Sequence, residues 1–345
     1  MLTVGLDAEH FRQSAAGIAR YARSLSTELR KIPSVNVIEL GGGPVVRRGT
    51  AKKRLTTLRQ DFVWYPLLAR RSAARHGAQV YHSPLPRGPL APGSPPFVIT
   101  VHDLVAVRFP ETTTAWSRLY GAATLKRVLR AADRIIAPSN DTADDLNSLL
   151  GIDPAKIRVV PNGVEAHFFA SAKAKPAIEF PYVLFVGTPE PRKNLQRLVS
   201  AMTILRKQGF LERLVVVGGG GWGEQLKTDD DILPMGHVTD DQLLALYASA
   251  SCLAIPSLHE GFGLPVLEAM AAGTPVVAAS TGALPEVVGN AGVLVDPGNP
   301  RSIADGIAGA IGERDSLIAK GRARAREFSW AKAADLTAAV YRELV

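Results

Sequence analysis

The stretch from His259 to Ala279 reads HEGFGLPVLEAMAAGTPVVAA. Pro265 suits the first turn of a helix, where its missing N–H costs nothing, and Gly273 suits the end of that helix. The apolar run Val276–Ala279 then predicts a buried strand. The stretch therefore predicts a glycine-rich loop followed by a helix and a strand, which is typical of α/β folds with parallel sheets.

Two carboxylates flank this predicted helix start, Glu260 before it and Glu268 within its first turns. The backbone N–H groups at the start have no partners within the helix and lie at the positive end of its dipole, so they suit an anion or a polar ligand. These groups belong to Gly261, Phe262, Gly263 and Leu264. Because two carboxylates can hold neighbouring hydroxyls, the combination indicates a sugar nucleotide as the ligand.

Strand-like and helix-like segments alternate along the rest of the chain, which predicts two doubly wound α/β domains with parallel sheets. The predicted strands are Leu2–Leu6, Val35–Leu40, Ala78–His82 and Phe97–Val101, then Val183–Val186, Leu214–Val217, Ala254–Ile255, Val276–Ala279 and Val293–Val295. The predicted helices include Gly17–Leu29, Asn194–Lys207 and Glu327–Leu344. Residues 166–181, rich in small residues, Lys and Pro, are predicted to link a first domain at 1–168 to a second at 169–326.

Composition describes a soluble globular protein, because 46% of the 345 residues are hydrophobic and their length suits about two domains. The single cysteine, Cys252, lies in an apolar run and is predicted to be a buried strand thiol, so no intrachain disulfide is expected. The N-terminus lacks the apolar core of a signal peptide, and no run of 18 apolar residues occurs. We therefore expect a cytoplasmic protein that does not span a membrane.

Positive charge is concentrated in the first half of the chain. Residues 1–168 carry 23 Lys and Arg against 13 Asp and Glu, whereas residues 169–345 carry 17 against 19. Between Arg47 and Arg75, nine basic residues face only Asp61, with aromatic and aliphatic residues between them. This composition suits an anionic membrane surface, so peripheral contact through residues 47–75 is one hypothesis and a solvated basic face is the other. Nucleic acid would also match the charge, but no motif that reads nucleic acid is present.

A second cationic motif follows the predicted strand Val183–Val186. The run Gly187-Thr188-Pro189-Glu190-Pro191-Arg192-Lys193-Asn194 joins that strand to a helix. The planar fork of Arg192 and the compact charge of Lys193 can hold a diphosphate through several charge-assisted hydrogen bonds, each worth about 1.5–3 kcal/mol. The acidic run Asp229-Asp230-Asp231 lies in a polar loop and is interpreted as a solvated turn, so no metal site is predicted.

These motifs resemble the retaining glycosyltransferases of family 4, whose signature is two glutamates with seven residues between them in a Glu-Gly-Phe-Gly-Leu-Pro run, as Glu260 and Glu268 stand here. The resemblance implies the GT-B architecture: two Rossmann-like domains facing across a cleft, with the last helix, within 327–345, crossing back to the first domain. It also implies that Arg192 and Lys193 bind the donor diphosphate in place of a metal, without a cofactor. Glu260 would then hold sugar hydroxyls and Glu268 ribose hydroxyls.

The N-terminal half resembles the same family at two further positions. His102, in Thr100-Val101-His102-Asp103, follows a predicted buried strand and is expected to contact the donor sugar, with Asp103 as either a site residue or a brace for the loop. The segment Ser14 to Tyr21 looks like the family's N-terminal loop near the acceptor. Its candidate acceptor-side residues are Gly17, Arg20 and Tyr21.

The resemblance implies transfer of a hexose from a nucleoside-diphosphate sugar to an acceptor hydroxyl with retention at the anomeric carbon. Mannose from GDP-mannose is the favoured donor, because Glu190-Pro191-Arg192-Lys193-Asn194 and Gly17-Ile18-Ala19-Arg20-Tyr21 look most like mannosyltransferase-type members. UDP-glucose and other UDP- or GDP-hexoses stay open. So do a glycan, a lipid-linked saccharide and a small metabolite as acceptor. A sugar-nucleotide 2-epimerase and a non-catalytic nucleotide- or glycan-binding subunit are the alternatives.

Overall fold

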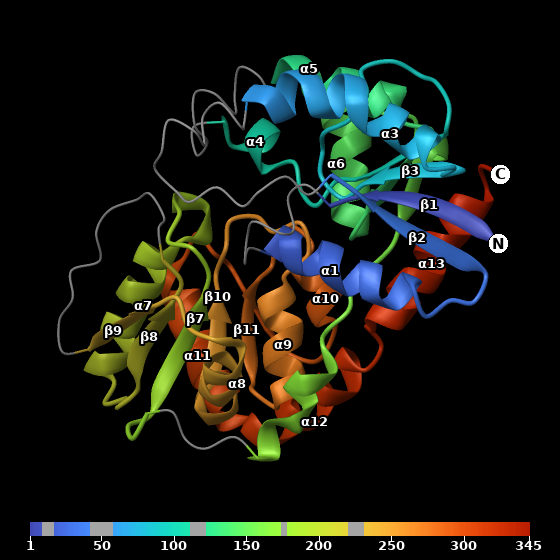
Figure 1. Cartoon of the computed structure of the whole chain (residues 1–345). Helices are drawn as coiled ribbons and strands as arrows, with labels where there is room; N and C mark the ends of the chain where they lie inside the picture. Colours follow the sequence, from blue (N-terminus) through green and yellow to red (C-terminus); the bar gives the residue numbers. More distant parts are fainter. Residues whose placement is uncertain (9–16, 42–57, 111–121, 174–177, 220–230) are drawn as a thin grey trace. The chain divides into compact units, whose positions relative to one another are not determined.

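The structure is a computed structural model that describes residues 1–8, 17–41, 58–110, 122–173, 178–219 and 231–345. The chain divides into two compact units (Figure 1). The first comprises Met1–Gly163 with Trp330–Val345, and the second comprises Val164–Ser329. The last helix, α13 (Trp330–Arg342), thus belongs to the unit that contains the N-terminus.

The first unit alternates strands and helices. Its strands are β1 (Leu2–Asp7), β2 (Val35–Leu40), β3 (Val80–Ser83), β4 (Phe97–Thr100), β5 (Arg134–Ala137) and β6 (Ile157–Val159). Its helices, besides α13, are α1 (Gly17–Leu29), η1 (Gln60–Leu68), α3 (Ala69–Arg75), α4 (Val105–Arg108), α5 (Ala122–Ala131), α6 (Asn140–Leu150) and η4 (Pro154–Lys156). The predicted bounds of α1 and β2 are confirmed, whereas β5 and β6 had no counterpart in the sequence prediction.

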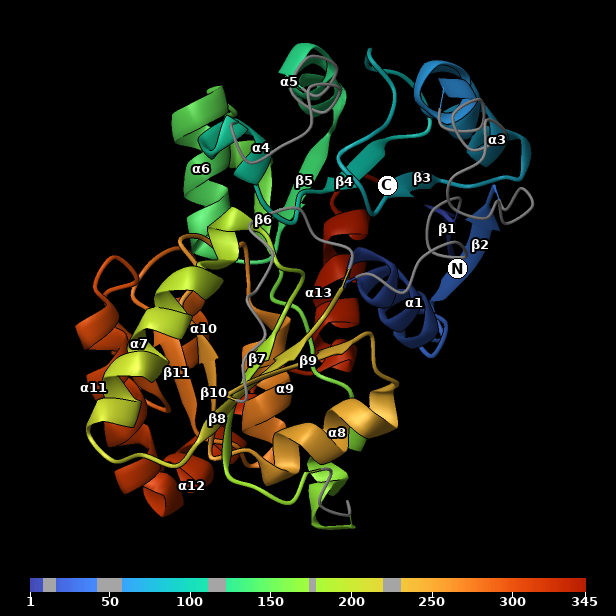
Figure 2. The ribbon, with the colours of Figure 1, turned by 90° about the vertical axis from the view of Figure 1, so that its left-hand side faces the viewer.

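The sheet of the first unit is parallel, with the order β2-β1-β3-β4-β5-β6 among its described strands. Val4 on β1 lies beside Val37 on β2 and Val80 on β3. Buried apolar side chains fill the space between one face of the sheet and α3, α5 and α6. On the other face α1 packs against α13, and Figure 2 shows the two helices side by side.

The second unit has the same alternation. Its strands are β7 (Tyr182–Val186), β8 (Arg213–Val217), β9 (Ile232–Gly236), β10 (Cys252–Ile255), β11 (Val276–Ala279) and β12 (Val293–Val295). Its helices are η5 (Ala166–Lys173), η6 (Pro191–Lys193), α7 (Leu195–Lys207), α8 (Asp240–Ser249), α9 (Leu264–Ala272), α10 (Leu284–Val288), α11 (Pro300–Gly312) and α12 (Arg314–Ala325). The predicted strands are present, and Cys252 is buried in β10 as expected.

The second sheet is parallel, and its described strands have the order β12-β11-β10-β7-β8-β9. Alternate residues of β7 point to opposite faces, so Tyr182 and Leu184 join a core with α8 and α9. Val183 and Phe185 join a second core with α7 and α11. Counted along the chain, the order is 3-2-1-4-5-6, which is that of dinucleotide-binding folds. The two doubly wound parallel sheets confirm the predicted fold class.

The direction in which strands are added reverses between β7 and β10. At such a reversal, the loops that follow the two central strands diverge to opposite faces and leave a crevice at the carboxyl edge of the sheet, where ligands bind in this class of fold. The loop after β7 contains Arg192 and Lys193, and the loop after β10 contains Glu260. The topology therefore places the two predicted motifs next to each other, although about seventy residues separate them in the chain.

Asn194 fixes the end of the loop after β7. Its backbone has φ +60°, a left-handed conformation that asparagine tolerates better than most residues. Its side-chain amide donates hydrogen bonds to the carbonyls of Pro256, 2.9 Å away, and Pro297, 2.7 Å away, while its Oδ1 accepts one from Arg197. One side chain thus joins the loops after β7, β10 and β12.

A buried polar chain crosses the first unit beneath the end of β4. His82 Nδ1 is 2.6 Å from the Tyr341 hydroxyl, and His82 Nε2 is 2.9 Å from Thr100 Oγ1. The Tyr21 hydroxyl lies 3.0 Å from the same Thr100 oxygen. Burial, together with the nearby positive charge that His102 can take up, lowers the pKa of His82 to about 3. These hydrogen bonds therefore join α1, β3, β4 and α13 around the neutral imidazole of His82.

No helix among the residues that the structure describes is both long enough and apolar enough to span a bilayer.

The neutral state of His82 predicts a loss of stability in acid. Below pH 6.5 the unfolded chain takes up a proton at this residue, whereas the folded protein does so only near pH 3. The free energy of unfolding should therefore fall as the pH drops through this window, by up to about 1.4 kcal/mol per pH unit from this residue. Urea unfolding at pH 6 and pH 5 should show a smaller loss in His82→Gln than in the wild type.

The exposed His76 offers the matched control, since His76→Gln replaces an imidazole that lies outside this buried network. Equal losses in His82→Gln and the wild type would contradict the assignment of His82 as a buried neutral group.

Asn194→Ala should lower the free energy of unfolding by about 2–4 kcal/mol, because it removes three side-chain hydrogen bonds and places a Cβ-bearing residue without a polar side chain at positive φ. Asn194→Gly should lose less, since glycine relieves the backbone cost while losing the same hydrogen bonds. Urea unfolding of the two variants measures both terms. The interpretation fails if Asn194→Ala is as stable as the wild type.

Candidate active site

The carboxyl edge of the second sheet brings together the cationic motif and the first glutamate of the paired motif. Lys193 Nζ lies 2.5 Å from Glu260 Oε1, and the Arg192 guanidinium donates to Glu260 Oε2 at 3.1 Å. All three side chains are largely buried, with 10–15% of each exposed. One carboxylate is therefore the shared counter-ion of both cations.

The cations decide the protonation state of Glu260. Burial alone raises the pKa of this carboxyl, but the charges of Lys193 and Arg192 and hydrogen bonds from Lys193 and Ser257 outweigh burial and hold the pKa at about 2. Glu260 is thus ionised at neutral pH. Its negative charge neutralises part of the positive charge of the two cations while no other anion is bound.

Further contacts fix Arg192 between the two loops. Its Nε donates to Glu190 at 3.1 Å, and its guanidinium also donates to the His259 carbonyl at 3.2 Å. Its own carbonyl accepts the N–H of Leu258 at 2.7 Å. The loops after β7 and β10 are therefore joined by backbone and side-chain bonds, which hold the guanidinium in one orientation.

The glycine-rich stretch of the sequence motif forms the start of α9. Gly263 precedes the helix at φ +103°, and a Cβ there would come within 2.7 Å of Leu284, so glycine is required. No side-chain cap bonds the first N–H groups of α9, and Pro265 lies in its first turn as predicted. Gly261 and Leu264 complete the backbone at this helix start.

Phe262 points into the protein. Its ring is 6% exposed, belongs to the apolar core on one face of the sheet and meets Phe328 edge-on at 6.0 Å. Phe262 can therefore contact a bound donor substrate only through its backbone. Its side chain anchors the loop in the core. Donor binding by Gly261 to Leu264 stays a prediction.

Glu268 lies inside α9 and is 2% exposed. The hydroxyl of Tyr247, on α8, donates to its Oε2 at 2.9 Å. This hydroxyl orients the carboxylate. The sequence gives no sign of this role, because Tyr247 lies in an ordinary apolar helical pattern. The role of Glu268 toward a ribose stays a prediction.

In the first unit, His102 follows β4 by two residues, as predicted. Its Nε2 donates to the Pro84 carbonyl at 3.0 Å, so the neutral ring presents Nδ1 as its acceptor. Burial lowers the pKa of His102, although the Pro84 carbonyl and the charge of Asp103 oppose this shift. Asp103 accepts the N–H of Val105 at 3.2 Å and thus braces the loop.

The three candidate acceptor-side residues differ in exposure. Gly17 begins α1 and is exposed, and Arg20 is half-buried. Tyr21 is 2% exposed; its ring meets His102 edge-on at 4.6 Å, and its hydroxyl lies beside Thr100. A supporting position behind His102 fits these contacts better than direct contact with an acceptor. Ser14, Ala15 and Ala16 lie outside the described residues.

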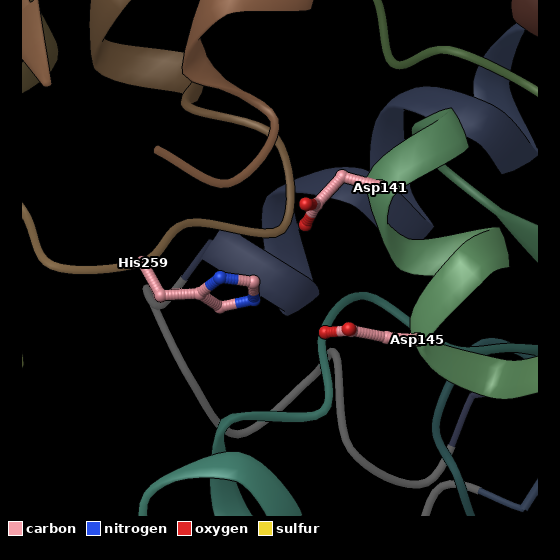
Figure 3. Close-up of side chains that lie close together, drawn as sticks. All are labelled: Asp141, Asp145 and His259. Carbon is pink, nitrogen blue, oxygen red and sulfur yellow. The ribbon is translucent and has the colours of Figure 1, made fainter. Parts of the chain in front are cut away.

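Other acidic groups have local partners. Figure 3 shows that Asp141 and Asp145 project from the same side of α6, one turn apart, and it also draws His259, on the loop after β10. Arg108 donates to both carboxylate oxygens of Asp145, at 2.8 and 3.0 Å.

In the acidic run 229–231, only Asp231 is described, and it pairs with Arg206. Metal-independent chemistry stays a prediction.

Comparison with known proteins assigns the family. A family model described as "Glycosyltransferase Family 4" matches residues 15–168, and one described as "Glycosyl transferases group 1" matches residues 180–313. The O-antigen chain mannosyltransferase B of Escherichia coli is 30% identical over 273 residues, 72% of this chain and 70% of that protein. An MMP alpha-(1->4)-mannosyltransferase of Mycolicibacterium hassiacum is 33% identical over 72% of this chain and 66% of its own length.

Solved structures agree with the fold. A sucrose-phosphate synthase from Thermosynechococcus elongatus matches with a TM-score of 0.73 at 22% identity, over 100% of this chain and 99% of that one. Anabaena HepE, solved in complex with UDP-glucose, matches with a TM-score of 0.70 at 18% identity, over 99% of this chain and 100% of that one. These neighbours show the GT-B glycosyltransferase fold. Together with the family models and the mannosyltransferase relatives, they show that the chain is a glycosyltransferase of family 4.

Proposed function

We propose that this enzyme transfers a hexose from a nucleoside-diphosphate sugar to an acceptor hydroxyl with retention at the anomeric carbon. The observation that carries the proposal is the contact of Glu260 with both Arg192 and Lys193 at the strand-order reversal. Two clustered cations suit a diphosphate, and a carboxylate beside them suits sugar hydroxyls. A donor sugar nucleotide presents both groups within one molecule.

The ion pairs give the site a way to exchange partners. A diphosphate that binds Arg192 and Lys193 competes with Glu260 for the same donors and brings more negative charge than one carboxylate. Glu260 then exchanges cation contacts for the hydroxyls of the sugar attached to that diphosphate. The exchange leaves no buried charge unpaired. An unpaired buried charge would destabilise the complex.

Catalysis follows from where charge develops. As the bond from the anomeric carbon to the diphosphate breaks, negative charge grows on the leaving phosphate, so contacts from Arg192 and Lys193 strengthen in the transition state. The N–H groups at the start of α9 can add to this stabilisation. We propose front-face displacement, in which the leaving phosphate helps to deprotonate the acceptor hydroxyl. No metal or cofactor takes part in this proposal.

The remaining candidate residues have positioning roles in the proposal. Glu268, oriented by Tyr247, holds the ribose hydroxyls. His102 accepts a hydrogen bond from a sugar hydroxyl at Nδ1, since its Nε2–H is committed to the Pro84 carbonyl. A lowered pKa keeps this imidazole neutral near pH 7 and therefore able to accept.

The favoured donor is GDP-mannose. Its support is the mannosyltransferase names of two relatives and the sequence of the Arg192–Lys193 loop. UDP-hexoses stay in the test because a structural neighbour was solved with UDP-glucose. For the acceptor, we propose a glycan or glycolipid hydroxyl, with a small metabolite as an alternative suggested by relatives named D-inositol 3-phosphate glycosyltransferase. We place the enzyme in the cytoplasm, at the membrane face where a lipid-linked acceptor lies.

Transfer assays with a panel of GDP-, UDP- and ADP-sugars and mixed glycan acceptors test the proposal. Product should form from one donor, with GDP-mannose as the expected one, and NMR should show that the anomeric configuration of the donor is retained. Glu260→Gln and Lys193→Met should each lower transfer at least tenfold, because each removes a contact to the donor. The exposed Glu313 and Lys207 supply matched controls, Glu313→Gln and Lys207→Met, which should keep wild-type activity.

Near-normal transfer by both site variants would contradict the assignment. An epimerised sugar nucleotide without transfer would identify an epimerase. Tight nucleotide binding with no turnover across the donors and acceptors would identify a binding subunit.

A further inference from the structure

Exposed apolar side chains gather on one helical segment of the first unit. This segment comprises residues 58–75 and includes η1 and α3, which follow each other without a break. Its five exposed large hydrophobic side chains are 37–51% exposed. They are Leu58, Phe62, Val63, Leu67 and Leu68. A concentration of this kind on a surface marks an interaction site rather than scattered exposure.

The unusual pitch of η1 puts Phe62 and Leu67 in one row with Leu58. η1 is a π-helix that contains Pro66, and the Ala69 N–H bonds the Trp64 carbonyl five residues earlier. A π-helix brings residues four to five apart onto the same side. Exposed positions recur at that interval from Leu58 through Phe62 and Leu67, and the row continues along α3 to Arg71 and Arg75.

The opposite side of η1 is anchored in the protein. Asp61 is fully buried and pairs with Arg87 at 2.7 Å, and the Trp64 indole donates to Asp7 at 2.9 Å. Tyr65 is 2% exposed. Of the aromatic residues in this segment, Trp64 and Tyr65 therefore face inward, since the Trp64 indole bonds Asp7 and Tyr65 is buried, whereas Phe62 faces outward at 51% exposed.

Only positive charge accompanies the exposed row. Asp61 is the sole acidic residue between 58 and 75, and it is buried. The exposed charged side chains of the segment are Arg59, Arg71 and Arg75. We define the exposed side chains of this segment, apolar and basic, as the apolar-basic face. A face with bulky apolar side chains and cations but no exposed acid complements an anionic lipid surface.

We propose that the apolar-basic face docks the enzyme on an anionic lipid bilayer. Phe62 and Leu67 enter the boundary between headgroups and acyl chains, while Arg59, Arg71 and Arg75 contact the phosphates. The aliphatic stems of arginine side chains can lie along apolar surface with their guanidinium groups at headgroup level. The proposed function supplies the reason for docking, which is access to a membrane-bound acceptor. Docking itself requires no donor and no acceptor.

Vesicle co-sedimentation tests the proposal with the whole 345-residue chain and no sugar nucleotide. The protein should bind phosphatidylcholine vesicles that contain 30% phosphatidylglycerol at least tenfold more tightly than pure phosphatidylcholine vesicles, and 0.5 M salt should weaken this binding. Phe62→Ser combined with Leu67→Ser should lower binding at least tenfold, and so should Arg71→Glu combined with Arg75→Glu.

Matched controls come from the second unit, where Leu211 is 72% exposed and Lys207 and Lys320 are exposed. Leu211→Ser, and Lys207→Glu combined with Lys320→Glu, should bind vesicles like the wild type. Wild-type protein that ignores anionic vesicles, or face variants that bind as well as the controls, would overturn the proposal; the first result would direct attention to an acidic protein as the partner. Neither result bears on sugar transfer, which is measured separately.

Discussion

The shared ion pair of Glu260 with Arg192 and Lys193 is the interaction on which the candidate site depends. A buried carboxylate stays ionised only if nearby charges offset its lost hydration, and here two cations do so. Those cations come from the loop after β7, while the carboxylate comes from the loop after β10. The strand order makes β7 and β10 neighbours, so a parallel sheet with this reversal is what makes the interaction geometrically available.

Around this ion pair, polar contacts hold the loops and side chains in place. Asn194 joins three loops with one side chain, and the Leu258 N–H bonds the Arg192 carbonyl. Across the first unit, His82 and Thr100 hold the ring of Tyr21 against His102. Such supports keep charged and polar side chains in place before a substrate arrives, so less free energy is needed to order them on binding.

Much of this fold can be predicted from the sequence. Strands such as Val276–Ala279 are short apolar runs, and helices such as Gly17–Leu29 begin and end at recognisable residues. β9 was not predicted because Pro234 and Gly236 interrupt its apolar run, and both residues weaken the pattern of a strand. Residues with diagnostic spacing, such as Glu260 and Arg192, could be found as site candidates. Their supports could not, because Tyr247, His82 and Tyr341 acquire their partners only when distant elements pack together.

The central claim is that Glu260 occupies, in the absence of substrate, the cations that bind the donor diphosphate. Calorimetric titration of GDP and UDP into wild type, Glu260→Gln and the control Glu313→Gln measures it directly. If the claim is correct, Glu260→Gln binds the preferred nucleoside diphosphate several-fold more tightly than the wild type, because a neutral amide competes less for Arg192 and Lys193, while the control is unchanged. Equal or weaker binding by Glu260→Gln would contradict the claim.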